Sequence, residues 1–449
     1  MPGVVAGHRI EHALSEGVPA HGTGPAELRA CRLSQRKTSA ADPVPELAGL
    51  SSPTYLVLAD LAGMVRHSGT TPDSLLMLRS GEEVLPMKIA QIAPLYERVP
   101  PLLYGGTERI VAYLTEELVR QGHEVTLFAS GDSRTGAAVV PCSEAALRLD
   151  PLIRDPLSYH LMMMDEVGRR AAEFDVLHFH TDLVHFPLLR HLSKPTLTTV
   201  HGRLDLADLK PFYEFFGQAP LISISADQRR PLPSANWVGT VHHGLPADGL
   251  PFSPVATGGY LAFLGRIAPE KRPDRAIEIA DRLGLPLKIA AKIDKADQSY
   301  WEAVVKPLVK KSRNVEFVGE INEATKPDFL GNALALLFPI DWPEPFGLVM
   351  IEAMACGTPV IAFRRGSVPE IIEHGVSGFI VDDVDGAVQA VAQVEMLPRA
   401  EVRRCFERRF TAERMARDYL AIYRALTKGD VVERERLQDN EPALLRSAA

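Results

Sequence analysis

Two glutamates, Glu344 and Glu352, stand in the segment of this sequence that most strongly suggests chemistry. Pro343 and Pro345 flank Glu344. Because proline fixes its own backbone and restricts the residue before it, the two prolines hold Glu344 in an extended loop. Glu352 falls inside the helix that is predicted to follow. Two carboxylates at this spacing are by themselves typical of surface acids, so the interpretation depends on the residues around them.

The residues between the two glutamates predict a binding loop that leads into a helix. Gly347 lets the backbone approach a ligand closely, and a small-residue helix is predicted over 348–356, ended by Gly357. The backbone amides of Phe346, Gly347 and Leu348 then lie at a helix N-terminus, where they can bind phosphate or other polar oxygens. This setting favours a functional pair of carboxylates.

A second segment, GRIAPEK, carries Arg266 and Lys271 at the end of a predicted strand. The planar guanidinium of Arg266 can hold phosphate oxygens, and Lys271 adds a compact positive charge. A diphosphate leaving group gains negative charge as its bond breaks, so two cations beside it stabilise the transition state more than the ground state. The plainer alternative is that both residues only decorate a strand–helix turn. With these cations no metal ion is expected, and Asp382 and Asp383 are interpreted as a surface turn.

The remaining candidates rest on shorter motifs. Gly105 and Gly106 follow the first predicted strand and permit close backbone approach, with a plain tight turn as an equal alternative. Their setting is not the GxGxxG fingerprint, which disfavours an NAD enzyme. His201 ends another strand and is placed at the mouth of a cleft. His178 and His180 lack a third metal ligand. They are assigned to packing or to contact with an acceptor substrate.

The chain has 449 residues, which is too long for one ordinary core and predicts two domains with additions. Its formal net charge of -8 gives no general reason to bind nucleic acid or an anionic membrane, and the basic run over 399–409 is interpreted as a solvated helix face. The four cysteines are scattered, which favours a reduced location. No apolar run approaches the roughly 20 residues that span a bilayer, and no signal peptide is apparent, so a cytoplasmic protein is expected.

From Met87 onward, short apolar strands alternate with amphipathic helices, the pattern of a doubly wound parallel α/β sheet. A Pro/Gly-rich connector over 246–258 separates two such series. The strands of the first are predicted over 88–93, 124–129, 175–180, 196–200 and 220–224, and those of the second over 260–264, 287–291, 315–318, 335–338, 359–362 and 378–381. Ligands of such sheets bind beyond the carboxyl ends of the strands, so a cleft between two domains is the expected site.

These motifs together resemble those of the GT-B glycosyltransferases of family 4, which include sucrose-phosphate synthases and many lipopolysaccharide and mannosyl transferases. Glu344 and Glu352 match the family's E-x7-E motif, and Arg266 and Lys271 match its G-R-x4-K pattern. The resemblance extends over about 87–427, with the motifs in the same order. It implies the GT-B fold, in which two Rossmann-like doubly wound domains face each other across a cleft.

The resemblance also implies roles for individual residues. Glu344 and His201 are expected to contact the donor sugar and to act in catalysis, and Glu352 to bind the ribose hydroxyls. The other expected donor-binding residues are Arg266 and Lys271 at the diphosphate, Phe346, Gly347 and Leu348 at the helix N-terminus, Gly105 and Gly106 in the loop facing diphosphate and acceptor, and Ile321, where relatives hold the nucleotide base through backbone.

The implied organisation has five parts. They are an N-terminal extension over 1–86, an acceptor-side domain over 87–253, a donor-nucleotide domain over 254–410, a terminal helix over 411–428 that can cross back to the first domain, and a charged tail over 429–449. The extension is interpreted as an upstream translation artefact before a start at Met87, with a mostly disordered segment as the alternative.

The implied activity is retaining transfer of a hexose from a nucleotide diphosphate sugar, with UDP-glucose-like donors preferred. The acceptor is an unidentified saccharide, lipid-linked or small molecule, and a peripheral visit to a membrane surface stays open. No cofactor is expected beyond the donor substrate. A nucleotide-sugar 2-epimerase of similar architecture and a noncatalytic sugar-nucleotide-binding protein are the alternatives.

Overall fold

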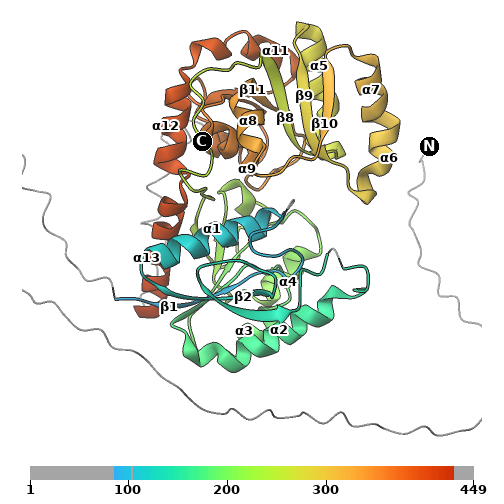
Figure 1. The fold of residues 1–449 in the computed structure, drawn as a ribbon. Helices are drawn as coiled ribbons and strands as arrows, with labels where there is room; N and C mark the ends of the chain where they lie inside the picture. The colour runs from blue at the N-terminus through green and yellow to red at the C-terminus, as the bar shows by residue number, and fades with distance from the viewer. Residues whose placement is uncertain (1–84, 103–104, 149, 429–449) are drawn as a thin grey trace, which may run out of the picture. The chain divides into compact units, whose positions relative to one another are not determined.

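The computed structural model describes residues 85–102, 105–148 and 150–428, all of which belong to one compact unit. The extension predicted over 1–86 therefore lies outside the described residues, apart from Leu85 and Pro86. The predicted tail over 429–449 also lies outside them. The described chain forms two parallel β-sheets with helices between consecutive strands (Figure 1). The doubly wound α/β prediction is thereby confirmed.

The first sheet has seven strands in the order β3-β2-β1-β4-β5-β6-β7, and every neighbouring pair is parallel. Its strands are β1 (Lys88–Ile92), β2 (Glu124–Ser130), β3 (Ala138–Ser143), β4 (Val176–Phe179), β5 (Thr196–Thr199), β6 (Leu221–Ser223) and β7 (Trp237–Thr240). The strand order reverses between β1 and β4, which is where ligands bind in open parallel sheets. Strands β3 and β7 were not predicted.

Helices cover both faces of this sheet. They are α1 (Gly106–Arg120), α2 (Pro156–Arg170), α3 (Phe186–Leu189) and α4 (Leu209–Phe215), with short 3₁₀ turns at Ala171–Glu173 and Asp227–Arg229. Successive residues of β1 face opposite sides, so Ile89 packs in the cluster that contains α1, and Ala90 in the cluster that contains α2. Burial on both faces explains why these strands read as continuous apolar runs.

The second sheet has six parallel strands in the order β10-β9-β8-β11-β12-β13. They are β8 (Tyr260–Arg266), β9 (Leu287–Lys292), β10 (Val315–Gly319), β11 (Ala333–Phe338), β12 (Val360–Phe363) and β13 (Gly378–Val381). Here the order reverses between β8 and β11. Both reversals place loops at the carboxyl ends of strands where a ligand can contact them.

The helices of the second series are α5 (Pro273–Leu283), α6 (Gln298–Tyr300), α7 (Lys306–Lys311), α8 (Lys326–Gly331), α9 (Leu348–Ala355), α10 (Val368–Ile371) and α11 (Val384–Val391). Single turns lie at Pro269–Lys271, Lys295–Asp297, Trp301–Val305 and Val394–Met396. Helix α5 begins at Pro273, directly after the single turn at Pro269–Lys271 and Arg272. The cause is local, because Arg272 has a positive φ of 53° and cannot continue a right-handed helix from the preceding turn.

Two C-terminal helices, α12 (Arg399–Arg409) and α13 (Ala412–Lys428), complete the described chain. Helix α12 packs against α9, and α13 packs alongside α1 (Figure 1). Tyr419 and Tyr423 of α13 are fully buried in the cluster shared with α1. Helix α13 therefore forms part of the layer that covers the first sheet.

The interpretation of residues 399–409 as a solvated helix face holds for Arg404 and Arg408, which are exposed, and fails for the other three arginines of the run. Arg399 donates hydrogen bonds to the backbone carbonyls of Ser253, Gly331 and Ala333, and to the hydroxyl of Thr358. Arg403 and Arg409 likewise donate to backbone carbonyls. An arginine has five guanidinium N–H groups, so it can donate to several backbone carbonyls that secondary structure leaves unpaired. The run therefore contributes to packing of the connector and α9.

Candidate functional site

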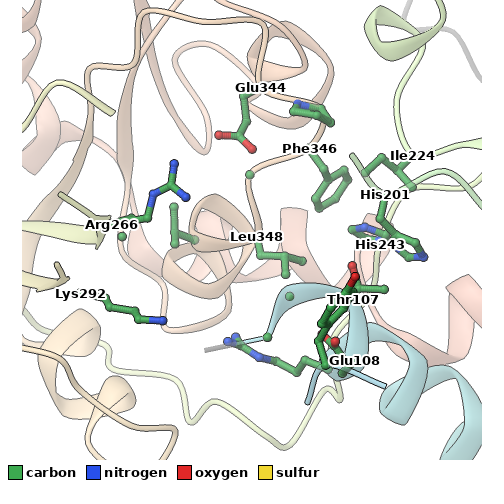
Figure 2. Close-up of a pocket in the computed structure, with 18 of the residues that line it drawn as sticks. Thr107, Glu108, His201, Ile224, His243, Arg266, Lys292, Glu344, Phe346 and Leu348 are labelled. Atoms are coloured by element: carbon green, nitrogen blue, oxygen red, sulfur yellow. The ribbon is translucent and has the colours of Figure 1, made fainter. Parts of the chain in front are cut away.

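A cavity of about 750 Å³ lies at the carboxyl ends of both sheets. All of the site residues predicted from sequence line it: Gly105, Gly106, His201, Arg266, Lys271, Ile321, Glu344, Phe346, Gly347, Leu348 and Glu352. Figure 2 shows Glu344, Phe346 and Leu348 on one segment, with His201 and His243 beside Phe346 and with Glu108 near the start of α1. The fold thus brings together residues that are widely separated in the sequence.

Glu344 is almost buried and is held through one of its oxygens. Lys271 Nζ donates to Oε2 of Glu344, and the indole Nε1 of Trp342 donates to the same oxygen at 3.1 Å. The Lys271 ammonium also lies 4.6 Å from the centre of the Trp342 ring. Neither contact involves Oε1, so the carboxylate is oriented by two donors and keeps an oxygen for a ligand.

The loop that carries Glu344 is fixed by a turn from a neighbouring segment. Gly366 has a positive φ of 52°, and a Cβ atom there would lie 2.4 Å from the backbone nitrogen and oxygen of Glu344. Ser367 donates from its amide to the Glu344 carbonyl at 3.0 Å, and from its hydroxyl to the Phe346 carbonyl at 2.8 Å. Only glycine allows this approach, so the turn sets the position of the loop.

Glu352 lies in a buried ion cluster on α9. Its Oε1 accepts from Arg109 Nη1 at 2.5 Å and from Lys326 Nζ at 2.8 Å. Burial would raise the pKa of Glu352, but the charges of Lys326 and Arg109 outweigh burial and hold that pKa below its usual value. The ionised carboxylate lines the cavity, and its contacts leave Oε2 without a hydrogen-bond partner among the described residues.

Arg266 lies among acidic side chains at the end of β8. Its guanidinium is 2.5 Å from a carboxylate oxygen of Glu270, 3.3 Å from Asp297 and 3.8 Å from Asp294. Lys292 ends the neighbouring strand β9, lines the same cavity and pairs with Asp294 at 3.0 Å. An anion that binds these cations has to compete with the carboxylates that already surround them.

His201 follows β5 and lies in a row of aromatic side chains. Its Nε2 is 2.9 Å from Nδ1 of His180, and its ring stacks on His243 with 5.3 Å between centres. The His243 ring in turn lies 4.8 Å from that of Phe346. Burial lowers the pKa of His201 to about 3, so the imidazole is neutral near pH 7. His201 is therefore suited to hydrogen bonding and not to carrying charge.

Several cavity residues were missed by sequence reasoning. Arg109 and Lys326 hold Glu352, and neither belongs to a recognisable motif. Glu108, in the first turn of α1, is only 5% exposed, and burial raises its pKa to about 7. The one available signal was its position two residues after the glycine pair. A buried carboxyl with a perturbed pKa in a pocket marks a candidate functional group.

The first-sheet side of the cavity also carries an exposed aromatic ring. Tyr96 lines the cavity and is 39% exposed. Its ring lies 4.9 Å from that of His160 and 6.0 Å from the guanidinium carbon of Arg148. Arg148 also pairs with the buried Glu97 at 3.2 Å. Aromatic faces flanked by polar groups are common in sites that bind ligands with both apolar and hydroxyl-bearing surfaces.

Two acidic residues outside the cavity lining have structural roles. Glu370 is structural, because it accepts from the amides of Ala226 and Asp227 at 2.7 and 2.8 Å. Asp383 caps α11 by accepting from Gly386 N at 2.8 Å. Among residues 85–102, 105–148 and 150–428, no group of three or more His, Cys, Asp or Glu is placed to hold a metal ion. In the same residues, no helix is both long and apolar enough to cross a bilayer.

Family models match both halves of the described chain. The model described as Glycosyltransferase Family 4 matches residues 104–256, and the model described as Glycosyl transferases group 1 matches residues 254–408. A glycogen synthase from Mycobacterium tuberculosis is 26% identical over 408 residues, which cover 77% of this chain and 97% of the relative.

Solved structures share the arrangement of both sheets. The glycosyltransferase AviGT4, involved in avilamycin A biosynthesis, is 26% identical with a TM-score of 0.59, and the match covers 77% of this chain and 99% of that one. Anabaena HepE, solved in complex with UDP and glucose, shares the fold at 16% identity with a TM-score of 0.60, over 76% of this chain and all of the other.

Proposed function

Because this chain is a glycosyltransferase of the GT-B fold and family 4, we propose that it transfers a hexosyl group from a nucleoside diphosphate sugar to an acceptor hydroxyl, with retention of configuration. The observation that carries the proposal is the Glu344–Lys271 pair on the wall of the cavity. It combines a carboxylate that can hold sugar hydroxyls with a cation that can neutralise a departing phosphate.

Lys271 exchanges its partner, Glu344, for phosphate when the donor binds. In the ligand-free cavity its ammonium is paired with Glu344 and lies over Trp342. A diphosphate entering beside Arg266 offers Lys271 a more highly charged partner, and the ammonium then moves toward phosphate oxygens. This exchange frees Oε2 of Glu344 to accept from a sugar hydroxyl. Donor binding thus makes Lys271 available to phosphate and gives Glu344 a second oxygen that can accept from the sugar.

Glu352 is proposed as the anchor of the nucleoside. A carboxylate binds the two hydroxyls of a ribose well only when it is ionised, and the charges of Lys326 and Arg109 keep Glu352 in that form despite its burial. Its remaining oxygen can accept from ribose hydroxyls. This assignment removes Glu352 from the reacting centre, so Glu344 and Glu352 do not form the nucleophile and acid/base pair of a double-displacement reaction.

The chemical step is therefore a substitution on one face of the sugar. The acceptor oxygen forms a bond to the anomeric carbon as the bond from that carbon to the β-phosphate oxygen breaks. The proton of the acceptor hydroxyl passes to the departing phosphate, and Lys271 and Arg266 stabilise the negative charge that remains. The neutral His201 contributes hydrogen bonding to the donor sugar. With these cations the step requires no metal ion.

The donor is proposed to be UDP-glucose, with UDP as the nucleotide and glucose as the transferred sugar. HepE, which shares this fold, was solved with both of these groups bound. A thermal-shift series with UDP, GDP and ADP sugars tests this preference, because a ligand that binds only the folded state raises the melting temperature by mass action. Stabilisation by UDP-glucose above the other sugars is expected, and equal response to all of them would contradict it.

Substitution of Glu344 tests the proposed function directly. Glu344→Gln should lower turnover by roughly 100-fold or more, because the amide has one accepting oxygen where the carboxylate has two. The affinity for UDP should stay within about threefold of that of the parent. Turnover is measured as transfer to a panel of saccharide acceptors, and affinity by calorimetry with UDP. Glu278→Gln, which changes an exposed carboxyl on α5, is the matched control. Equal losses of turnover and UDP affinity in Glu344→Gln would refute the assignment, as would acceptor-independent isomerisation of the donor.

A further inference from the structure

A continuous chain of buried hydrogen bonds connects α13 to His201. Gln91 Nε2 donates to the hydroxyl of Tyr423 at 3.1 Å, and Gln91 Oε1 accepts from Nε2 of His180 at 2.7 Å. Nδ1 of His180 then lies 2.9 Å from Nε2 of His201. The links come from α13, β1 and the ends of β4 and β5, so the chain runs across neighbouring strands directly to the cavity.

The direction of each hydrogen bond follows from the chemistry of the groups. With the Gln91 amide in the orientation that the structure gives it, its oxygen can only accept, so His180 carries its proton on Nε2. Burial and neighbouring histidines hold the pKa of His180 well below its usual value, and a neutral imidazole has a single N–H. Nδ1 of His180 therefore accepts a hydrogen bond, and the donor is the Nε2–H group of His201.

The same reasoning fixes the other nitrogen of His201. A neutral imidazole protonated on Nε2 carries a lone pair on Nδ1. That atom is buried and has no hydrogen-bond partner among the described residues. Buried polar atoms in native proteins are almost always paired, so an unpaired acceptor on a cavity residue points to a ligand that supplies the donor. A sugar hydroxyl is such a donor.

We propose that Gln91 and Tyr423 are positioning residues that hold His201 in the Nε2–H tautomer, with Nδ1 presented to accept a hydrogen bond from a donor-sugar hydroxyl. The proposal rests on the proposed function for the identity of the sugar. The tautomer itself depends only on the hydrogen-bond chain. Tyr423 acts by orienting the Gln91 amide: its hydroxyl lies 2.7 Å from Nδ1 of His178, and when it donates its proton there it is left to accept from Nε2 of Gln91.

A second branch of the network supplies a matched control. The Tyr423 hydroxyl is also 2.7 Å from Nδ1 of His178, whose Nε2 is 2.7 Å from the hydroxyl of Thr199. Thr199 lies 2.9 Å from the hydroxyl of Tyr419. Tyr419 is as buried as Tyr423 and belongs to the same helix, yet its loss leaves every link from Tyr423 to His201 in place.

The experiment compares Tyr423→Phe with Tyr419→Phe in the full chain. Each variant loses one buried hydroxyl, so both should unfold at comparably lower temperatures. Only Tyr423→Phe should lower kcat, by about tenfold, with the donor KM changed less than twofold. Gln91→Met, which removes the amide but keeps the volume, should reproduce the loss. Equal kcat values in Tyr423→Phe and Tyr419→Phe would overturn the proposal.

A spectroscopic measurement separates positioning from simple stability. Nitrogen-15 NMR of histidine-labelled protein distinguishes protonated from unprotonated ring nitrogens, and the His201 signals are identified by their loss in His201→Gln. The parent and Tyr419→Phe should show Nε2–H at His201, whereas Tyr423→Phe and Gln91→Met should show a mixture of tautomers. Nδ1–H in the parent would refute the inference. Because this readout needs no substrate, it remains decisive even if transfer from nucleotide sugars is not observed.

Discussion

The buried carboxyl of Glu108 makes a quantitative prediction about stability and pH. Burial raises the pKa of Glu108 from 4.5 to about 7. The folded protein therefore keeps this proton up to about pH 7, whereas the unfolded chain releases it near pH 4.5. At this group the folded state binds more protons between these values, so the contribution of Glu108 to the free energy of unfolding falls as pH rises through the interval. The full effect is about 3 kcal/mol, at 1.36 kcal/mol for each pKa unit.

Glu108→Gln removes this dependence because the amide stays neutral. At pH 5 the variant and the parent should have similar stability, since the parent carboxyl is then largely protonated. At pH 8 the variant should be more stable by up to about 3 kcal/mol, which corresponds to an increase of about 1 M in the urea midpoint. The assay is urea unfolding of the ligand-free protein, followed by tryptophan fluorescence at intervals from pH 5 to pH 8.

The control for this experiment is Glu173→Gln. Glu173 is exposed, and a hydrogen bond from Arg170 lowers its pKa, so its titration falls below the interval studied. That variant should keep the pH dependence of the parent. If the difference in stability between Glu108→Gln and the parent stays constant from pH 5 to pH 8, then Glu108 is ionised in the folded protein and the argument from burial fails.

Two further substitutions test the cluster and the loop that the structure shows. Lys326→Met should lower the free energy of unfolding by about 3 kcal/mol, because it leaves the buried Glu352 with Arg109 as its remaining cation. Urea unfolding measures this loss. A loss below about 1 kcal/mol would contradict a paired, ionised Glu352. Gly366→Ala should reduce turnover by roughly 100-fold, because the added methyl group would displace the backbone of Glu344. An unchanged kcat would show that turnover does not depend on the position of this loop.

The two-sheet fold could be predicted because its signals are local. Strand and helix periodicity depends on residues a few positions apart, and it identified the strands that carry the site. The strand over β3, AVVPCS, escaped because an internal proline and partial exposure obscure its pattern. The start of α5 at Pro273 also carries a local signal, because proline suits the first position of a helix and disfavours helical backbone in the residue before it.

The candidate site was also predictable where its geometry is set by neighbouring residues. Pro343 and Pro345 restrict the backbone and Gly347 permits a positive φ, so the loop around Glu344 followed from the printed sequence. The partners of its carboxylates did not follow. Lys326 and Arg109 meet Glu352 only because α8, α9 and α1 converge on one cavity.

The sequence by itself determined the alternation of strands and helices and the loop that carries Glu344, because backbone restrictions and apolar periodicity act along the chain. Tertiary structure alone decided the charge and hydrogen-bonding state of those residues. Three arginines of α12 donate to backbone carbonyls, burial raises the pKa of Glu108 to about 7, and His201 is reached by a hydrogen-bond chain from Tyr423. These properties depend on desolvation and on contacts between distant segments, which exist only after the sheets and helices have packed.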